Sequence, residues 1–382
     1  MRRTLKIKLS LSVGLLFALS ALASADGPAP DKFRVDLPPG IPYEVWSYYV
    51  PRNNPLTPAR VELGRRLFFD ARLSVDNTVS CSTCHDPKLA FADGKALPEG
   101  VGGRRGTRNS PTIFNAMFNS GQFWDGRAQS LEDQAKLPLI DPNEMGNASH
   151  EQVVERVRGL PEYKEAFLNA FGEEATIDLI AKAIASFERT LVSGNSAFDR
   201  FNAGDRKAMS DAAQRGLLIF RTKGRCAICH SFNSSFPFFT DQNYRNTGIG
   251  VNHPSFMGLT RRALESARNR EGADALRKAY VGEGAAELGR FLVTGNSLDI
   301  GAFRTPSLRD VELTAPYFHD GSAKTLKDVI LFYVKGGNDN PVRDWQLESV
   351  DLSEGEQSDL IEFLKALTGD YSRRLVETSG RL

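Results

Sequence analysis

Two short units of the sequence carry side chains that could do chemistry. Each unit has two cysteines three positions apart, followed at once by a histidine: "CSTCH" at 81–85 and "CAICH" at 226–230. Together they hold all four cysteines of the chain, which random placement would rarely produce. The six residues are Cys81, Cys84, His85, Cys226, Cys229 and His230.

Three kinds of site could use such units. A redox-active Cys-x-x-Cys pair does not need the histidine. A four-cysteine zinc site could use both pairs, but it would leave each histidine without a role. Covalent haem attachment uses every residue, because the thiols bond to the haem vinyl groups and the histidine becomes an iron ligand. The sequence therefore predicts two covalently bound haem c groups, one in each half.

The first residues favour export from the cytoplasm. Four basic residues precede a mostly apolar stretch at 9–22, and "ALASA" offers a cleavage site after Ala25. This pattern predicts a cleavable signal peptide at 1–25 and a periplasmic mature protein with no membrane insertion. An uncleaved anchor is the alternative, but the apolar stretch is short for a membrane span.

The charge balance and composition narrow the range of partners. The chain has 48 basic and 47 acidic side chains, and the signal peptide would remove only basic ones. A weakly acidic mature chain argues against nucleic acid as a partner. With 41% hydrophobic and 25% charged residues, the composition is that of a globular protein.

Helical patterns dominate the mature chain. Apolar residues recur at helical spacing over 177–191, and Gly194 is expected to end that helix. Ser353 and Glu356 form a predicted capping box, and Gly369 is expected to stop the helix that follows. These patterns predict an all-α fold with long loops, and no sequence repeat is evident beyond the haem motif. The predicted organisation is an extended lead-in at 26–55, an N-terminal haem domain at 56–200 and a C-terminal haem domain at 201–382.

Longer motifs then indicate a family. "LGRRLFFDARLS", "RNSPTIFNAMFNSGQFWDGRAQSLEDQAKLPLIDPNEM", "FERTLVS" and "FRTPSLRDVELTAPYFHDGSAKTLKDVILFY" follow one another between 63 and 369. Together they resemble the bacterial di-haem cytochrome c peroxidases and their MauG-type relatives. The resemblance implies two cytochrome c-like helical domains with haems near the domain interface. It also implies reduction of hydrogen peroxide at the N-terminal haem, with electrons that arrive from the C-terminal haem.

The resemblance assigns the residues of the N-terminal haem pocket. Glu144 in "DPNEM" matches the catalytic glutamate of the family, and Gln134 matches its polar neighbour. A peroxidase needs such a group to move a proton between the two peroxide oxygens. Trp124 matches the tryptophan between the two haems. The loop before "NSPT" lacks the histidine found in many members, which implies that the His85 haem has no protein ligand on its distal side.

A calcium ion also belongs to the haem interface in this family. The matching positions are Asn109 and the backbone carbonyls of Thr314 and Pro316, whose oxygens suit a hard cation. His319, in "YFHDG", falls in a family motif near the second haem. It is expected either to orient a haem propionate or to make a structural hydrogen bond.

Tyr333 occupies the position that supplies the sixth iron ligand of the second haem. Peroxidases that take electrons from small cytochromes have a methionine there, whereas tyrosine is the MauG-type pattern. Periodicity alone would place Tyr333 on a buried helix face. The chain departs from MauG at Gly224, where that enzyme has a tryptophan through which oxidising equivalents leave.

The leading functional hypothesis is a periplasmic di-haem peroxidase of the MauG-like branch, with hydrogen peroxide and an electron-donor protein as partners. An alternative is an oxidase that modifies a protein substrate through a two-haem high-valent state. A third possibility, from another class, is a di-haem electron carrier without catalysis.

Overall fold

Most helices of the protein start at a residue whose side chain caps them. Thr57, Ser130, Thr176, Thr325 and Ser353, for example, each accept a hydrogen bond from a backbone N–H in the first turn that follows. The computed structural model describes residues 35–282 and 284–379, so the predicted signal peptide lies outside it. Its helices are α1 (Tyr43–Tyr48), α2 (Pro58–Phe69), α3 (Cys81–Cys84), α4 (Leu131–Ile140), α5 (His150–Arg158), α6 (Pro161–Phe171), α7 (Ile177–Glu188), α8 (Ala197–Asn202), α9 (Asp211–Arg221), α10 (Phe256–Arg268), α11 (Ala273–Ala279), α12 (Phe291–Thr294), α13 (Leu326–Val334), α14 (Glu354–Lys365) and α15 (Asp370–Ser379).

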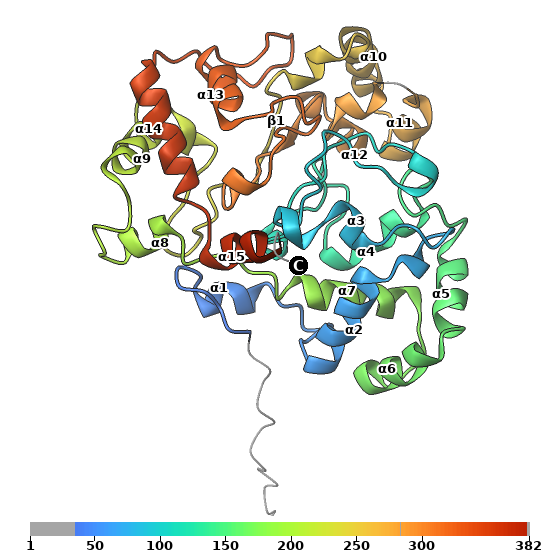
Figure 1. The fold of residues 1–382 in the computed structure, drawn as a ribbon. Coiled ribbons are helices and arrows are strands. Elements are labelled where there is room, and N and C mark those ends of the chain that lie inside the picture. The colour runs from blue at the N-terminus through green and yellow to red at the C-terminus, as the bar shows by residue number, and fades with distance from the viewer. Residues whose placement is uncertain (1–34, 283, 380–382) are drawn as a thin grey trace, which may run out of the picture. The chain divides into compact units, whose positions relative to one another are not determined.

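Strands contribute little to this part of the chain. β1 (Tyr244–Arg245) and β2 (Phe303–Arg304) form one antiparallel pair, with Tyr244 opposite Arg304. The predicted all-α fold with long loops is therefore confirmed (Figure 1). The predicted lead-in is not extended throughout, because α1 forms within it and buries Trp46, whose indole N–H donates to the Arg189 carbonyl.

Two pairs of closely packed helices form the framework of the fold. In each pair, a glycine allows the two helices to approach each other closely. α2 packs on α7, and α9 packs on α14 (Figure 1). A Cβ added at Gly64 of α2 would collide with the Ala183 carbonyl oxygen of α7 and crowd Phe187. A Cβ added at Gly216 of α9 would meet the Asp359 carbonyl of α14 and the Phe363 side chain in the same way. The two halves thus use the same helix crossing.

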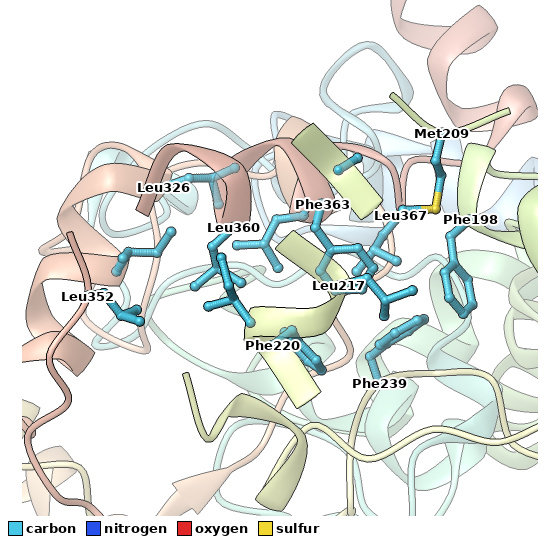
Figure 2. Close-up of a cluster of buried hydrophobic side chains, with 14 residues drawn as sticks. Phe198, Met209, Leu217, Phe220, Phe239, Leu326, Leu352, Leu360, Phe363 and Leu367 are labelled. Carbon is cyan, nitrogen blue, oxygen red and sulfur yellow. The ribbon is translucent and has the colours of Figure 1, made fainter. Parts of the chain in front are cut away.

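The second helix pair encloses a cluster of buried apolar side chains. Phe220 and Leu217 of α9 pack with Leu360 and Phe363 of α14, and Leu326 of α13 joins them (Figure 2). Phe220 and Phe363 meet edge to face with ring centroids 5.1 Å apart. This C-terminal cluster fixes α13, the helix that carries Tyr333, against the α9–α14 pair.

The two halves also share a longer segment at constant spacing. The stretch 109–138 matches 304–333 in backbone conformation: Asn115 and Asp310 are both left-handed, with φ of 60° and 61°. Phe123 and Phe318 also have positive φ, at 65° and 69°. Each stretch then leads into a capped helix, α4 or α13. The chain is therefore built on an internal repeat, which the sequence analysis did not predict.

The second half carries an addition between β1 and β2. The helices α10, α11 and α12 lie in this segment and enclose a smaller apolar cluster. Its fully buried members include Leu276, Leu288 and Phe291.

The predicted domain boundary near residue 200 stays a prediction.

Two helix ends can be compared with the sequence patterns. The capping box of Ser353 and Glu356 is confirmed at the start of α14, which ends at Lys365 ahead of Gly369. The prediction for the other helix is wrong at its end, because α7 stops at Glu188 and not near Gly194. After Glu188, hydrogen bonds to a distant segment replace the helical ones: the Asn115 side chain accepts from the Ser193 N–H and donates to the Ser193 carbonyl.

We expect Gly216→Ala to destabilise the folded protein by about 3 kcal/mol, the upper end for overpacking a tight contact. The added methyl group would force α9 and α14 apart at the Asp359 carbonyl. Denaturant unfolding of the haem-loaded protein measures the change. Gly355→Ala is the matched control, because the same helix α14 has open space there and the unfolding free energy should rise by about 0.5 kcal/mol. Equal stability of the two variants would contradict the close helix contact.

Candidate haem sites

The first haem motif is held by a short capped helix. Ser80 and Thr83 form a capping box at α3, and His85 follows directly as its C-terminal residue. The Nδ1 atom of His85 lies 3.1 Å from the Phe91 carbonyl oxygen. A carbonyl can only accept, so Nδ1 carries the proton and Nε2 keeps its lone pair for a metal. Burial lowers the pKa of His85, which also favours the neutral ring.

A cavity of about 230 Å³ opens beside this motif. Seven residues that the sequence analysis selected line it, although they come from separate parts of the chain. Trp124, Gln134 and Glu144 thus face the same space as the haem motif, whereas Thr314 and Pro316 are not among its lining residues. The seven residues are Cys81, Cys84, His85, Asn109, Trp124, Gln134 and Glu144.

Glu144 is positioned by the turn that follows α4. Its backbone carbonyl accepts from the Val101 N–H at 2.9 Å, and the approach of that segment requires Gly100, because a Cβ there would collide with the Glu144 backbone. Burial raises the pKa of the Glu144 carboxyl to about 7, and repulsion from Asp141 adds to the shift. A carboxyl group that titrates near neutral pH can both accept and return a proton.

Gln134 and Pro138 reach the cavity from α4. They lie one helical turn apart, and both line it. The internal repeat places Pro138 eight residues after the helix cap Ser130, and Tyr333 eight residues after the cap Thr325. A proline side chain has no atom that can coordinate iron. At this position of the repeat, the first half therefore lacks the possible iron ligand that the Tyr333 phenol provides in the second half.

The second haem motif repeats the histidine geometry. Cys226 begins a 3₁₀ helix, and the Nδ1 atom of His230 donates to the Phe239 carbonyl over 2.9 Å. Tyr333 lies on α13, and its pKa is raised by burial and then by the charges that Cys229 and Cys226 would carry. The phenol therefore lies within electrostatic range of both thiols of this motif.

A single peptide segment joins the two halves of the repeat. The Trp124 indole N–H donates to the Asn109 carbonyl over 2.8 Å, and the Asn109 N–H donates to the His319 carbonyl over 2.7 Å. Trp124 and His319 occupy matching positions of the repeat, with ring centroids 6.5 Å apart. His319 stacks on Phe303 and bonds to Glu287 through Nε2 at 2.8 Å, so it makes a structural hydrogen bond.

The residues around the first cavity fit a haem. Arg304 lines the cavity, is buried, and pairs with no carboxylate in the described part of the chain; its Nε atom has no hydrogen-bond partner. A buried cation without an anion is costly, and the haem propionates would supply the missing charge. Burial accordingly lowers the pKa of Arg304 to about 10.

The other uses of the cysteines are not supported. All four cysteines are unpaired in the structure, so neither unit forms a disulfide. Within residues 35–282 and 284–379, no three His, Cys, Asp or Glu side chains gather as metal ligands. The two pairs therefore do not meet in a four-cysteine zinc site.

Comparison with known proteins agrees with this geometry. The family described as "Di-haem cytochrome c peroxidase" matches residues 58–207. The "Methylamine utilization protein MauG" of Methylorubrum extorquens AM1 is 37% identical over 357 residues, which cover 92% of this chain and 89% of that protein. The chain belongs to the di-haem cytochrome c peroxidase family. The "Cytochrome-c peroxidase IdrP1" of Denitromonas iodatirespirans is also 37% identical, over 95% of this chain and 93% of its own length.

A solved structure extends the comparison to three dimensions. The crystal structure of a "MauG-like protein associated with microbial copper homeostasis" superposes with a TM-score of 0.71 and 31% identity. It covers 89% of this chain and 97% of that protein. As a di-haem peroxidase family member, the protein is an oxidoreductase that uses haem. No helix in the described residues is long and apolar enough to cross a membrane.

The sequence analysis did not select three residues that line the cavity beside His85. Pro138, Glu188 and Arg304 all line it, yet none was selected. The internal repeat could have drawn attention to Pro138, because aligning "RAQSLEDQAKLP" with "SAKTLKDVILFY" sets it against Tyr333. Glu188 and Arg304 carry no such signal, because only tertiary packing shows that their charges are buried.

Proposed function

We propose that the protein is a periplasmic di-haem c-type peroxidase. It reduces hydrogen peroxide at the N-terminal haem with electrons relayed from the C-terminal haem, which a periplasmic donor protein supplies. The predicted signal peptide supports the location, and the two Cys-x-x-Cys-His units support covalent haem. The observation that carries the proposal is the cavity in which Glu144 and Gln134 face the His85 motif.

The residues of this cavity divide the work. The bound haem would supply the redox chemistry of peroxide reduction. Cys81 and Cys84 would hold it through thioether bonds, and His85 Nε2 would bind its iron. Glu144 accepts a proton from one peroxide oxygen and returns it to the other, while Gln134 orients the molecule by hydrogen bonding. Trp124, whose indole binds the Asn109 carbonyl and lies near His319, would act as the bridge for electrons between the two haems.

A specific observation favours a second function. α13 reads "LKDVILFYV" and offers Tyr333 but no methionine. A phenolate stabilises oxidised iron and lowers its potential, which suits a haem that stores oxidising equivalents more than one that accepts electrons from a high-potential cytochrome. A MauG-type oxidase that modifies a protein side chain is therefore the second candidate. The missing exit tryptophan at Gly224 weighs against identical chemistry with MauG.

Calcium remains part of the proposal. Asn109 lies at the junction of the two halves, where its N–H binds the His319 carbonyl. The loop with Thr314 and Pro316 runs directly ahead of His319, and amide and carbonyl oxygens are the ligands that calcium prefers. A cation held by these three residues would tie the two haem segments together.

Three measurements on the protein exported to the periplasm test the proposed function: its mass, the spin state of its haems and its turnover of hydrogen peroxide. We expect the protein exported to the periplasm to exceed the mass of its mature chain by two haem groups. The ferric form should show a high-spin haem, and reduced cytochrome should be oxidised when hydrogen peroxide is added. Two six-coordinate haems without peroxide turnover would indicate an electron carrier. Peroxide reaction without cytochrome turnover would favour the protein-modifying oxidase.

A further inference from the structure

A second carboxyl group faces the haem cavity from the end of α7. The Glu188 side chain lines the cavity and is only 5% exposed. Its Oε2 atom has no hydrogen-bond partner, and no cation in the described residues forms an ion pair with it. The adjacent Arg189 does not neutralise it, because Arg189 makes two hydrogen bonds to Glu132, at 2.8 and 2.9 Å.

The surroundings of Glu188 disfavour its charged form. Burial raises the pKa of its carboxyl to about 8, in spite of the nearby Arg189 guanidinium. The C-terminal end of a helix carries a partial negative charge, which also opposes an anion there. The other titratable or charged groups that line the cavity are Cys81, Cys84, His85, Arg108, Arg127, Asp141, Glu144 and Arg304, and the charge of Glu188 acts on the Cys81 thiol.

The second half of the molecule shows that the fold does not need a carboxyl at this position. Gly64 meets Ala183 and Phe187 of α7 in the same way as Gly216 meets Asp359 and Phe363 of α14.

By this match, the residue after Phe363 is the counterpart of Glu188. It is Leu364, which is 6% exposed in the C-terminal cluster. A leucine therefore satisfies the same helix packing. The buried carboxyl is specific to the haem cavity of the first half.

A second cavity, of about 740 Å³, is lined by Arg189, the residue that follows Glu188 at this helix end. Glu132 and Arg189 line it, and so does Asp178, whose side chain is 67% exposed, so solvent reaches this space. The two cavities share three wall residues, Asn119, Gln122 and Leu131. Glu188 and Arg189 are thus neighbours in the chain that line different cavities.

We propose that Glu188 is a second proton-exchanging residue of the haem cavity, and that its protons arrive from the solvent-filled cavity around Glu132 and Arg189. This inference rests on the proposed peroxidase function. Reduction of one hydrogen peroxide to two waters consumes two protons and two electrons. The donor protein supplies the electrons, whereas Glu144 only moves a proton between the two oxygens. Glu188 releases one proton toward the water being formed for each electron that arrives, and it is reprotonated from the solvent side each time, so two protons enter for each peroxide that is reduced.

The test uses the di-haem protein and three substitutions. Glu188→Gln keeps the shape, Glu188→Leu installs the residue of the second half, and Glu188→Asp keeps the acid. We expect Gln and Leu to lower kcat for peroxide reduction by about a hundredfold, the lower end for loss of an acid–base group. Asp should recover much of this loss. Glu165→Gln, an exposed carboxylate on α6, is the control and should match the wild type.

A readout that does not depend on turnover separates this proposal from the proposed function. The reduction potential of the N-terminal haem should vary with pH around 8 in the wild type, because reduction favours the protonated carboxyl. Both Gln and Leu should abolish the part of this dependence that is centred near pH 8, while the part that Glu144 contributes near pH 7 should stay. Leu should unfold no more easily than the wild type, since it removes a buried unpartnered carboxyl. An unchanged kcat together with an unchanged pH dependence would overturn the role of Glu188. A wild type without peroxide turnover would refute the function, while the potential would still test Glu188.

Discussion

Glu144→Gln should slow the reaction with hydrogen peroxide by at least about a hundredfold, the usual scale for losing a general acid–base. The amide keeps the size of the side chain but cannot take a proton from the peroxide. Stopped-flow mixing with hydrogen peroxide, followed by haem absorbance, measures the rate. Glu155→Gln is the matched control, because Glu155 is exposed on α5 and should leave the rate unchanged.

The pH dependence of the same rate gives a second test of Glu144. Burial raises the pKa of its carboxyl to about 7, and only the deprotonated form can accept a proton. The rate of the wild type should therefore rise as the pH increases through about 7 and level off above it. The Gln variant should lack this rise. A Gln variant with the wild-type rate and pH profile would move the proton transfer to Gln134 and a water chain.

Tyr333→Met should raise the reduction potential of the C-terminal haem by a sizeable part of the roughly 0.8 V that axial ligands can span. A phenolate is a hard anionic donor that stabilises oxidised iron, whereas a thioether stabilises reduced iron. Potentiometric titration followed by optical spectra measures the shift. The control is Tyr317→Phe, because the Tyr317 hydroxyl only donates to the Val311 carbonyl and the potential should not change.

The spectrum of the wild type can contradict this assignment before any substitution is made. A methionine–iron charge-transfer band in the ferric protein would show that a methionine, and not Tyr333, binds the second iron. The helix α13 contains no methionine, so the ligand would have to come from another segment. Met145 lines the first cavity, and Met209 lies in the C-terminal cluster. Such a band would place the protein with peroxidases that accept electrons from high-potential cytochromes.

Local spacing made the haem motifs predictable from the sequence. In "CSTCH" and "CAICH" the chemistry depends on neighbours in the chain, and the structure adds the Nδ1 hydrogen bonds of His85 and His230. Glu144, Gln134 and Trp124 were selected through the family resemblance. The structure brings all three to one cavity, although their roles remain predictions.

Features that depend on tertiary contacts could not be predicted in this way. The apolar pattern of α7 continues past Glu188, but two hydrogen bonds between the Asn115 side chain and the Ser193 backbone hold the following residues in another conformation. Whether Glu188 and Arg304 are solvated or buried depends on which segments fold over them. Their residue types, common on protein surfaces, gave no indication of a cavity.

The internal repeat could not be predicted from the sequence, because its two copies share backbone conformation more than residue identity. Asn115 and Asp310 differ in charge, yet both adopt the left-handed conformation. Each also holds the backbone that follows the matching helix: Asn115 accepts from the Ser193 N–H and Asp310 accepts from the Gly369 N–H. Such equivalences become visible only when the contacts are known.

Pro138 and Tyr333 occupy the same position of the internal repeat, and this difference shows how two copies of one duplicated unit can take different functions. Two identical copies of the repeat would carry the same residue at this position, and the two halves would be redundant. A change of this one residue would give one half a phenol that can bind a metal and leave the other half with a proline, which cannot. Specialisation of the two copies would then need no rearrangement of the helices, since the crossings at Gly64 and Gly216 remain the same.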